Sequence, residues 1–170
     1  AIPPREPITA FPILPAPGLS LGDMPAQGLG ATDPNYQAAE AGKYLALIGG
    51  RASCPSEPDF GPGVPVQVPT LLQGGWDWTA AQFGLPSPPL PPGWESTSSA
   101  PDATGIGPAT AMQVGQISVS GRDAGGGGIC PSHPAGDFSG MDMADAEAIG
   151  WYLTNVPAVA SAAASACALP

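Results

Sequence analysis

The groups best suited to chemistry stand in the segment 42–56, GKYLALIGGRASCPS. A Cys-x-x-Cys-His pattern in this frame would hold a haem through two thioether bonds and one histidine nitrogen. Here Cys54 stands at the second cysteine position, Arg51 at the first, and Pro55 at the histidine position. A proline side chain has no atom that binds iron. The frame therefore matches a haem attachment site in which only the Cys54 thiol can react.

Three cysteines and one histidine are the reactive groups of the chain. An odd cysteine in an exported protein is expected to find a partner. Cys54 could pair with Cys130 or Cys167, or remain free as a buried thiol. His133 could bind a metal through a ring nitrogen, but a single loop histidine is more often unliganded. The residues alone leave these alternatives open.

A copper site and a phosphate site are the two other binding sites that we considered. Met141 and Met143 could join Cys54 and His133 around copper, but their spacing matches no copper motif, and core packing explains the methionines at least as well. The glycines at 125–128 follow no strand and lack the GxxxxGK[ST] pattern, so a surface loop explains them better than phosphate binding.

Three carboxylates, Asp142, Asp145 and Glu147, stand where a helix is expected to begin. Capping and the helix dipole explain them better than acid/base catalysis or calcium binding. No nucleophile motif surrounds the serines, and one histidine gives hydrolase chemistry little support. We therefore expect no enzyme activity.

Residues 1–34 precede the elements that must position these groups. Their eight prolines exclude helix nearly throughout, so we expect an extended Pro-rich arm that lies on the surface or on a partner. Asp33 and Pro34 then begin a helix that Gly49 ends. Apolar residues at helical spacing support this helix, namely Tyr36, Ala39, Tyr44, Leu45 and Ile48.

The rest of the chain predicts a long loop and two more helices. Residues 55–107 contain frequent Pro and Gly and a few scattered aromatic residues. This composition indicates a long irregular loop, and the aromatic side chains indicate that the loop packs against the rest of the domain. A weak helix is expected over about 110–119, and a stronger one opens near 139–142 and stops at Pro157. The weak helix has a poor apolar face of Met112, Gly115, Ile117 and Val119, whereas Ile149, Tyr152 and Leu153 form the buried face of the last helix.

Composition limits the classes of partner. The 170 residues are 43% hydrophobic, which is enough for the core of one domain, and carry a net charge of −10. That charge argues against nucleic acid and anionic membrane surfaces, and no apolar run is long enough to span a membrane. Charged residues are only 11% of the chain, against about 25% in typical soluble domains. A secreted Gly- and Pro-rich protein, or a sequence inferred from density in which surface side chains fade, would look like this.

Over residues 35–170 the chain resembles class I cytochrome c domains, as found in periplasmic electron-transfer proteins and in cytochrome subunits of membrane-bound dehydrogenases. Several separate stretches match in the right order. They are GKYLALIGG with the attachment frame, the glycines at 74–75 with 83–84, SAPDATGIG at 99–107, ICPSHP at 129–134, and FSGMDMADAEAIGWYLTNVPAV at 138–159.

This resemblance implies a mainly α, cytochrome c-like domain with long irregular loops, one haem c and an electron-transfer function. Arg51, Cys54 and Pro55 would occupy the attachment positions, and the segment with Gly105 and Ile106 is similar to the family's Thr-Gly-Ile-Gly. His133 stands where the family carries its methionine ligand. The resemblance also implies a disulfide between Cys130 and Cys167.

The departures at Arg51, Pro55 and His133 leave two hypotheses. In one, these three residues are misread where haem density merges with side chains, and the chain is a working cytochrome. In the other, the haem has been lost and the fold survives as a structural or accessory binding subunit. Under both, we expect an exported, periplasmic or extracellular protein. Its arm would contact a redox partner or neighbouring subunits.

Overall fold

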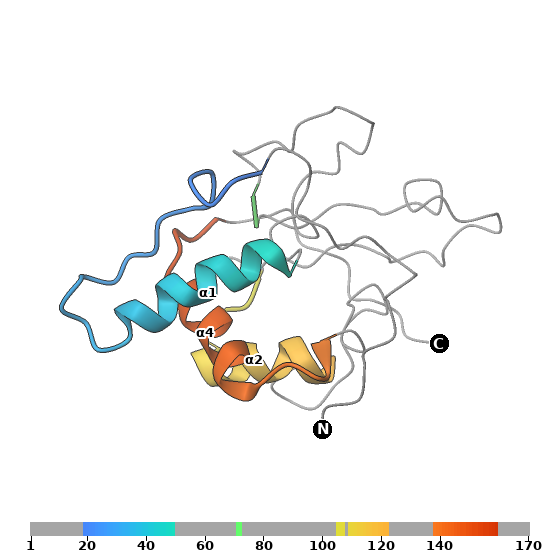
Figure 1. Cartoon of the computed structure of the whole chain (residues 1–170). Coiled ribbons are helices and arrows are strands. Elements are labelled where there is room, and N and C mark those ends of the chain that lie inside the picture. Colours follow the sequence, from blue (N-terminus) through green and yellow to red (C-terminus); the bar gives the residue numbers. More distant parts are fainter. Residues whose placement is uncertain (1–18, 50–70, 73–104, 108, 123–137, 160–170) are drawn as a thin grey trace, which may run out of the picture.

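The computed structural model describes residues 19–49, 71–72, 105–107, 109–122 and 138–159. Within these ranges the chain forms three helices and no strand. They are α1 (Tyr36–Ile48), α2 (Ala111–Ser120) and α4 (Met143–Leu153). Helix α4 is the centre of the arrangement, because both α1 and α2 pack against it (Figure 1). The expectation of a mainly α chain is confirmed for the described residues.

Local signals set where each helix begins. Asp33 Oδ1 accepts a hydrogen bond from the Asn35 amide at 2.8 Å, which turns the chain into α1. Thr110 and Gln113 form a reciprocal capping box at α2, and Asp142 Oδ1 accepts from the Ala144 amide at 2.8 Å at α4. The interpretation of Asp142 as a capping residue is therefore confirmed.

The helix ends follow the glycine signals more closely than the proline signal. Helix α1 stops at Gly49, and α2 stops at Gly121, which has a left-handed φ of 66°. Helix α4 ends at Leu153, before the predicted stop at Pro157. The Thr154 hydroxyl donates to the Gly150 carbonyl at 2.8 Å, so the side chain of the residue after the helix satisfies a carbonyl of its last turn.

The helices meet through small residues, which brings their backbones together. A Cβ placed on Gly42 of α1 would lie 1.8 Å from the Ala148 carbonyl oxygen of α4, and one on Gly150 would lie 1.9 Å from the Ala111 carbonyl oxygen of α2. Only a residue without a Cβ fits at such a distance. Gly42 and Gly150 therefore decide which faces of α1 and α2 turn toward α4.

The buried faces differ from the predicted ones in two helices. In α1 the buried residues are Ala39, Gly42, Ala46 and Leu47, while Tyr44 and Ile48 are 53% and 42% exposed. In α2 they are Ala111, Val114, Gly115 and Ser118, and Met112 is exposed. The predicted faces are wrong at Tyr44, Ile48 and Met112 and right at Ala39 and Gly115, because close backbone approach, and not side-chain size, selects the contact. In α4 the predicted burial of Ile149, Tyr152 and Leu153 is confirmed.

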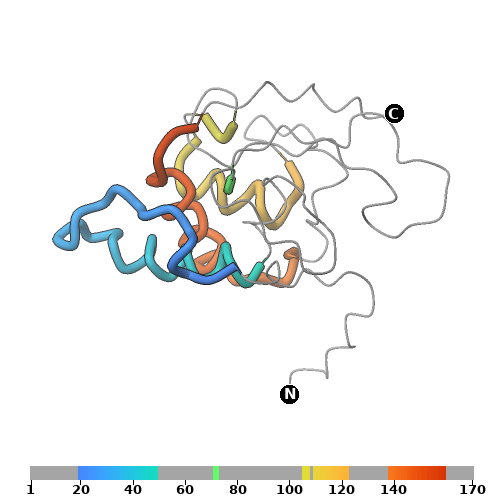
Figure 2. The backbone as a smooth tube through the Cα atoms, turned by 90° about the horizontal axis from the view of Figure 1, so that it is seen from above, coloured from blue at the N-terminus to red at the C-terminus, as the bar shows by residue number. Residues whose placement is uncertain are grey.

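The described part of the arm, residues 19–34, contains no helix, as its prolines predict. It runs back alongside α1 before it turns into that helix (Figure 1 and Figure 2). Met24 on this segment is only 3% exposed and belongs to the same core as Leu47 and Tyr152. This half of the arm therefore packs on the chain's own helices.

The core draws on segments far apart in the sequence. It combines the arm, all three helices, the pair at 71–72 and the turn that follows α4. Its buried members are Met24, Ala46, Leu47, Leu71, Leu72, Val114, Ile149, Tyr152, Leu153 and Val156.

Candidate functional site

Most residues of the predicted site lie outside the described residues. These are Arg51, Cys54, Pro55, His133 and the expected disulfide partners Cys130 and Cys167. Gly105 and Ile106 are described, and so are Gly49 and Phe138, which flank the segments that carry Arg51, Cys54, Pro55 and His133. The surroundings of the predicted site are therefore built from these four residues.

The turn at 105–107 leads directly into α2. Gly107 has a left-handed φ of 54°, and the Ala109 amide donates to the Ile106 carbonyl at 3.2 Å. A glycine suits this conformation because it lacks the Cβ that would clash. Ile106 is half-buried and packs against the core cluster. The predicted site residue Ile106 thus lies against the apolar interior, next to the N-terminus of α2.

The end of α1 contacts the residue that leads into α4. A Cβ placed on Gly49 would lie 3.4 Å from Cε1 and 3.7 Å from Cζ of Phe138. The Phe138 ring therefore packs over Gly49. Gly49 is the last described residue before the segment with Arg51, Cys54 and Pro55, and Phe138 is the first one after the segment with His133.

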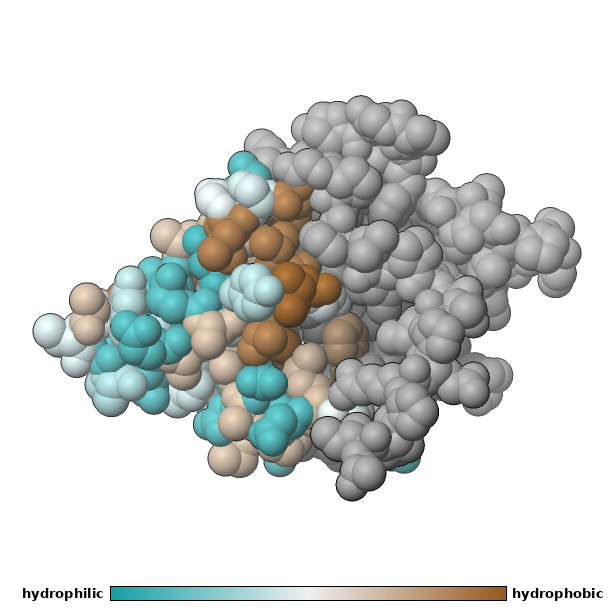
Figure 3. Space-filling view, viewed as in Figure 1, coloured by the Kyte–Doolittle hydropathy of each residue, from teal (hydrophilic) through white to brown (hydrophobic). Residues whose placement is uncertain are grey.

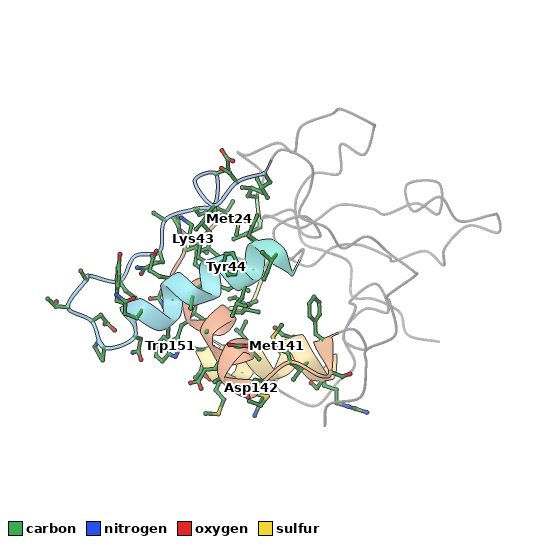
Figure 4. All side chains as sticks on the ribbon, in the orientation of Figure 1. Met24, Lys43, Tyr44, Met141, Asp142 and Trp151 are labelled. Carbon is green, nitrogen blue, oxygen red and sulfur yellow. The ribbon has the colours of Figure 1, made fainter. Side chains whose placement is uncertain are left out.

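The two methionines near the start of α4 have different surroundings. Met141 is half-buried and packs against the core, as the packing interpretation predicts, whereas Met143 is 43% exposed and that interpretation is wrong for it. Figure 4 shows Met141 and Asp142 together at the beginning of α4. No group of three potential ligands from His, Cys, Asp and Glu gathers among the residues that the structure describes.

Leu71 and Leu72 belong to the core, and their burial was not predicted from the sequence. Both side chains are buried, at 4% and 2% exposure, and Leu72 has a left-handed φ of 67°. Such a backbone conformation is unfavourable for leucine, so tertiary contacts must hold it. The signal in the sequence was weak, because two leucines in a Pro-rich stretch show no periodicity.

Tyr152 is the most buried titratable group among the described residues. Its hydroxyl donates to the Pro25 carbonyl at 2.9 Å. Burial raises the pKa of the Tyr152 phenol well above its usual value, and the negative charge of Glu40 adds to the rise. Tyr152 therefore stays neutral and acts as a hydrogen-bond donor between α4 and the arm.

The visible apolar surface gathers around the C-terminal end of α1, while the end near residues 30–37 is hydrophilic (Figure 3). Leu21, Tyr44 and Ile48 are large hydrophobic residues that are more than 40% exposed. Tyr44 and Ile48 stand four residues apart and so share one face of α1.

Comparison with protein-family models, with curated proteins and with solved structures gave no match in any of the three searches. Among the described helices, none combines the length and the apolar character that a membrane span requires. The function is therefore proposed from the sequence and from the geometry of the described elements.

Proposed function

We propose that this chain is an electron-transfer protein of the c-type cytochrome class that carries one haem. The observation that carries this proposal is the packing of Phe138 over Gly49. In a cytochrome c-like domain, the attachment segment after the first helix and the ligand segment before the last helix must both contact the one haem. Here these helices are α1 and α4. The Gly49 and Phe138 contact anchors the described ends of both segments side by side.

Two further features support the proposal. Helix α1 and helix α4, which come from the first and last of the resembling stretches, pack directly on each other. Ile106, from the third stretch, lies against the same core. Stretches far apart in the sequence thus contribute to one interior, as a single cofactor domain requires.

The residues as written do not fit a haem c with two thioether links and a His/Met pair of iron ligands. Cys54 offers one thiol, Arg51 offers none and Pro55 has no donor atom. The proposal therefore requires a cysteine at position 51, a histidine at position 55 and a methionine at position 133 in the protein itself. We place this protein in the periplasm or outside the cell, and we propose a redox partner or a neighbouring subunit as the partner of the arm.

The alternative is a haem-less accessory or structural subunit with the same helices. The burial of Leu71 and Leu72 favours it, because these side chains fill part of the same core cluster as Val114 and Tyr152. An interior filled by the chain's own side chains avoids the stability cost of an empty cofactor cavity. This alternative accepts residues 51, 55 and 133 as written.

The visible absorption spectrum of the purified protein, oxidised and then reduced with dithionite, separates the two functions. A Soret band with sharp α and β bands after reduction supports electron transfer. Peptide mass spectrometry across 42–56 and 123–137 is the matched measurement, since it reads positions 51, 55 and 133 directly. A spectrum without a Soret band, together with peptides that match the sequence as written, would refute the cytochrome and leave the accessory subunit.

A further inference from the structure

The arm is attached to the helices by a short segment, Met24–Leu29, which we call the strap. Its polar contacts join it to α1, to the C-terminal end of α4 and to the turn that follows α4. The Pro25 carbonyl accepts from the Tyr152 hydroxyl at 2.9 Å, the Gly28 amide donates to the Asn155 carbonyl at 2.7 Å, and the Gln27 side-chain amide donates to Glu40 Oε1 at 3.2 Å. Met24 adds an apolar anchor in the core (Figure 4).

The helix pair beneath the strap is joined by contacts of its own. Gly42 brings the backbones of α1 and α4 together at Ala148, and Gly115 and Gly150 do the same between α2 and α4. None of these contacts involves a strap residue. Because the strap contributes no helix or strand, its loss leaves the hydrogen bonds within α1 and α4 intact.

A compact turn separates the strap from α1. The Asp33 amide donates to the Gly30 carbonyl at 2.8 Å, and the Tyr36 amide donates to the Asp33 carbonyl at 3.1 Å. Gly30 has open space around it, since a Cβ placed there would meet no atom within 4 Å. Glycine has the widest backbone freedom of any residue, so Gly30 is a suitable position for a change of chain direction while the turn and α1 stay folded.

We propose that the strap is a latch that opens as a unit while α1, α2 and α4 remain packed. With the strap closed, residues 19–29 are held on the helices. With the strap open, these residues are released and reach about 35 Å from Gly30 when fully stretched. This inference concerns the described residues and does not depend on the presence of haem.

Native-state hydrogen exchange of the full chain tests the latch. In low urea, the Gly28 amide reports opening of the strap, and the Leu153 amide reports opening of α4. We expect Gly28 to be protected, yet to exchange at least about tenfold faster than Leu153 and with a weaker dependence on urea, because strap opening exposes Met24 and its neighbours but less surface than unfolding of the whole chain.

Three variants then separate the strap from the helices. Tyr152→Phe removes the bond to Pro25 and should speed exchange at Gly28 about fivefold. Gln27→Ala removes the hydrogen bond from the strap to Glu40 and should also speed exchange at Gly28, without changing a core residue. Tyr44→Phe removes an exposed phenol of α1 and is the matched control, with no expected change at Gly28.

A fourth variant decides the proposal. A Cβ at Gly115 would lie 2.8 Å from the Ala146 carbonyl, so Gly115→Ala weakens the helices without touching the strap. We expect Gly115→Ala to accelerate exchange at Leu153 and to leave Gly28 unchanged. Equal acceleration at both amides would overturn the proposal, since the strap would then open only when the whole chain unfolds. A Gly28 amide that exchanges at the rate of an unstructured peptide would overturn it too.

Discussion

Replacement of Gly42 by alanine should separate α1 from α4 and strongly destabilise the chain. The added Cβ would lie 1.8 Å from the Ala148 carbonyl oxygen, and the helical backbone fixes the positions of both atoms, so no rotamer change relieves the clash. The helices must therefore move apart by more than about 1 Å, and a gap of that size removes roughly half of the dispersion energy along the contact.

Two opposing terms set the magnitude. Alanine favours a helix over glycine by about 1 kcal/mol, so Gly42→Ala would be stabilising if the site were open. Overpacking of a close contact costs about 1–3 kcal/mol and occasionally more, and here the clash involves two backbones. We expect the clash to prevail, with a net loss of about 3 kcal/mol in the free energy of unfolding.

Urea unfolding followed by far-UV circular dichroism measures this loss. Gly140→Ala is the matched control, because a Cβ placed on Gly140 meets no atom within 4 Å, and we expect its stability to stay within about 0.5 kcal/mol of the parent. Gly150→Ala should behave like Gly42→Ala, since its Cβ would lie 1.9 Å from the Ala111 carbonyl oxygen. A Gly42→Ala protein as stable as the parent would refute the close crossing of α1 and α4.

Three further predictions follow from the described contacts. Met24→Ala should lower the free energy of unfolding by about 2–4 kcal/mol in urea titrations, because it empties a buried site in the core; an unchanged midpoint would show that the arm does not pack on the helices. Thr110→Ala should cost about 1 kcal/mol by removing the capping box with Gln113, and Thr110→Ser should restore most of it. Above about pH 10 the unfolded chain releases the Tyr152 proton while the folded chain keeps it, so stability should fall as pH rises through that range. Tyr152→Phe should remove this part of the alkaline slope in unfolding experiments from pH 9 to 12, and an unchanged slope would contradict the burial of the phenol.

Local sequence signals were sufficient for the starts of the helices and for the ends of α1 and α2, whereas α4 ends at Leu153, before the predicted stop at Pro157. Asp33 with Pro34 and the glycine at 49 placed α1, and the carboxylate of Asp142 placed the start of α4. These signals work because capping and chain reversal depend on residues within one helical turn. Proline likewise excluded helix from residues 19–34, whatever that segment packs against.

The predicted faces of α1 and α2 were wrong at their large side chains. Tyr44, Ile48 and Met112 are large and apolar, so periodicity assigned them to the contact, yet all three are exposed. The close contact of α1 with α4 is made by Gly42, whose small size has no weight in a hydrophobic pattern. In α4 the pattern succeeded for Ile149, Tyr152 and Leu153 because this helix is covered by both α1 and α2, although Met143 at its start is exposed.

The candidate site was less predictable than the helices. The sequence singled out Ile106 as part of a site segment, and the structure places it against the core. It gave no indication that Phe138 packs over Gly49, because that contact joins residues 89 positions apart. Leu71 and Leu72 were missed for the same reason, since their burial depends on partners far away in the chain.

The sequence by itself thus determined that the described chain is mainly helical, where its helices begin, where α1 and α2 end, and which segment cannot be helix. All of these follow from interactions within a few residues. Only the tertiary structure decided which helix faces meet, and that the strap lies on α1 and α4 through the hydroxyl of Tyr152 and the carbonyl of Pro25, 127 residues apart. Such contacts depend on how closely two backbones can approach, and a linear pattern of residue types does not contain that distance.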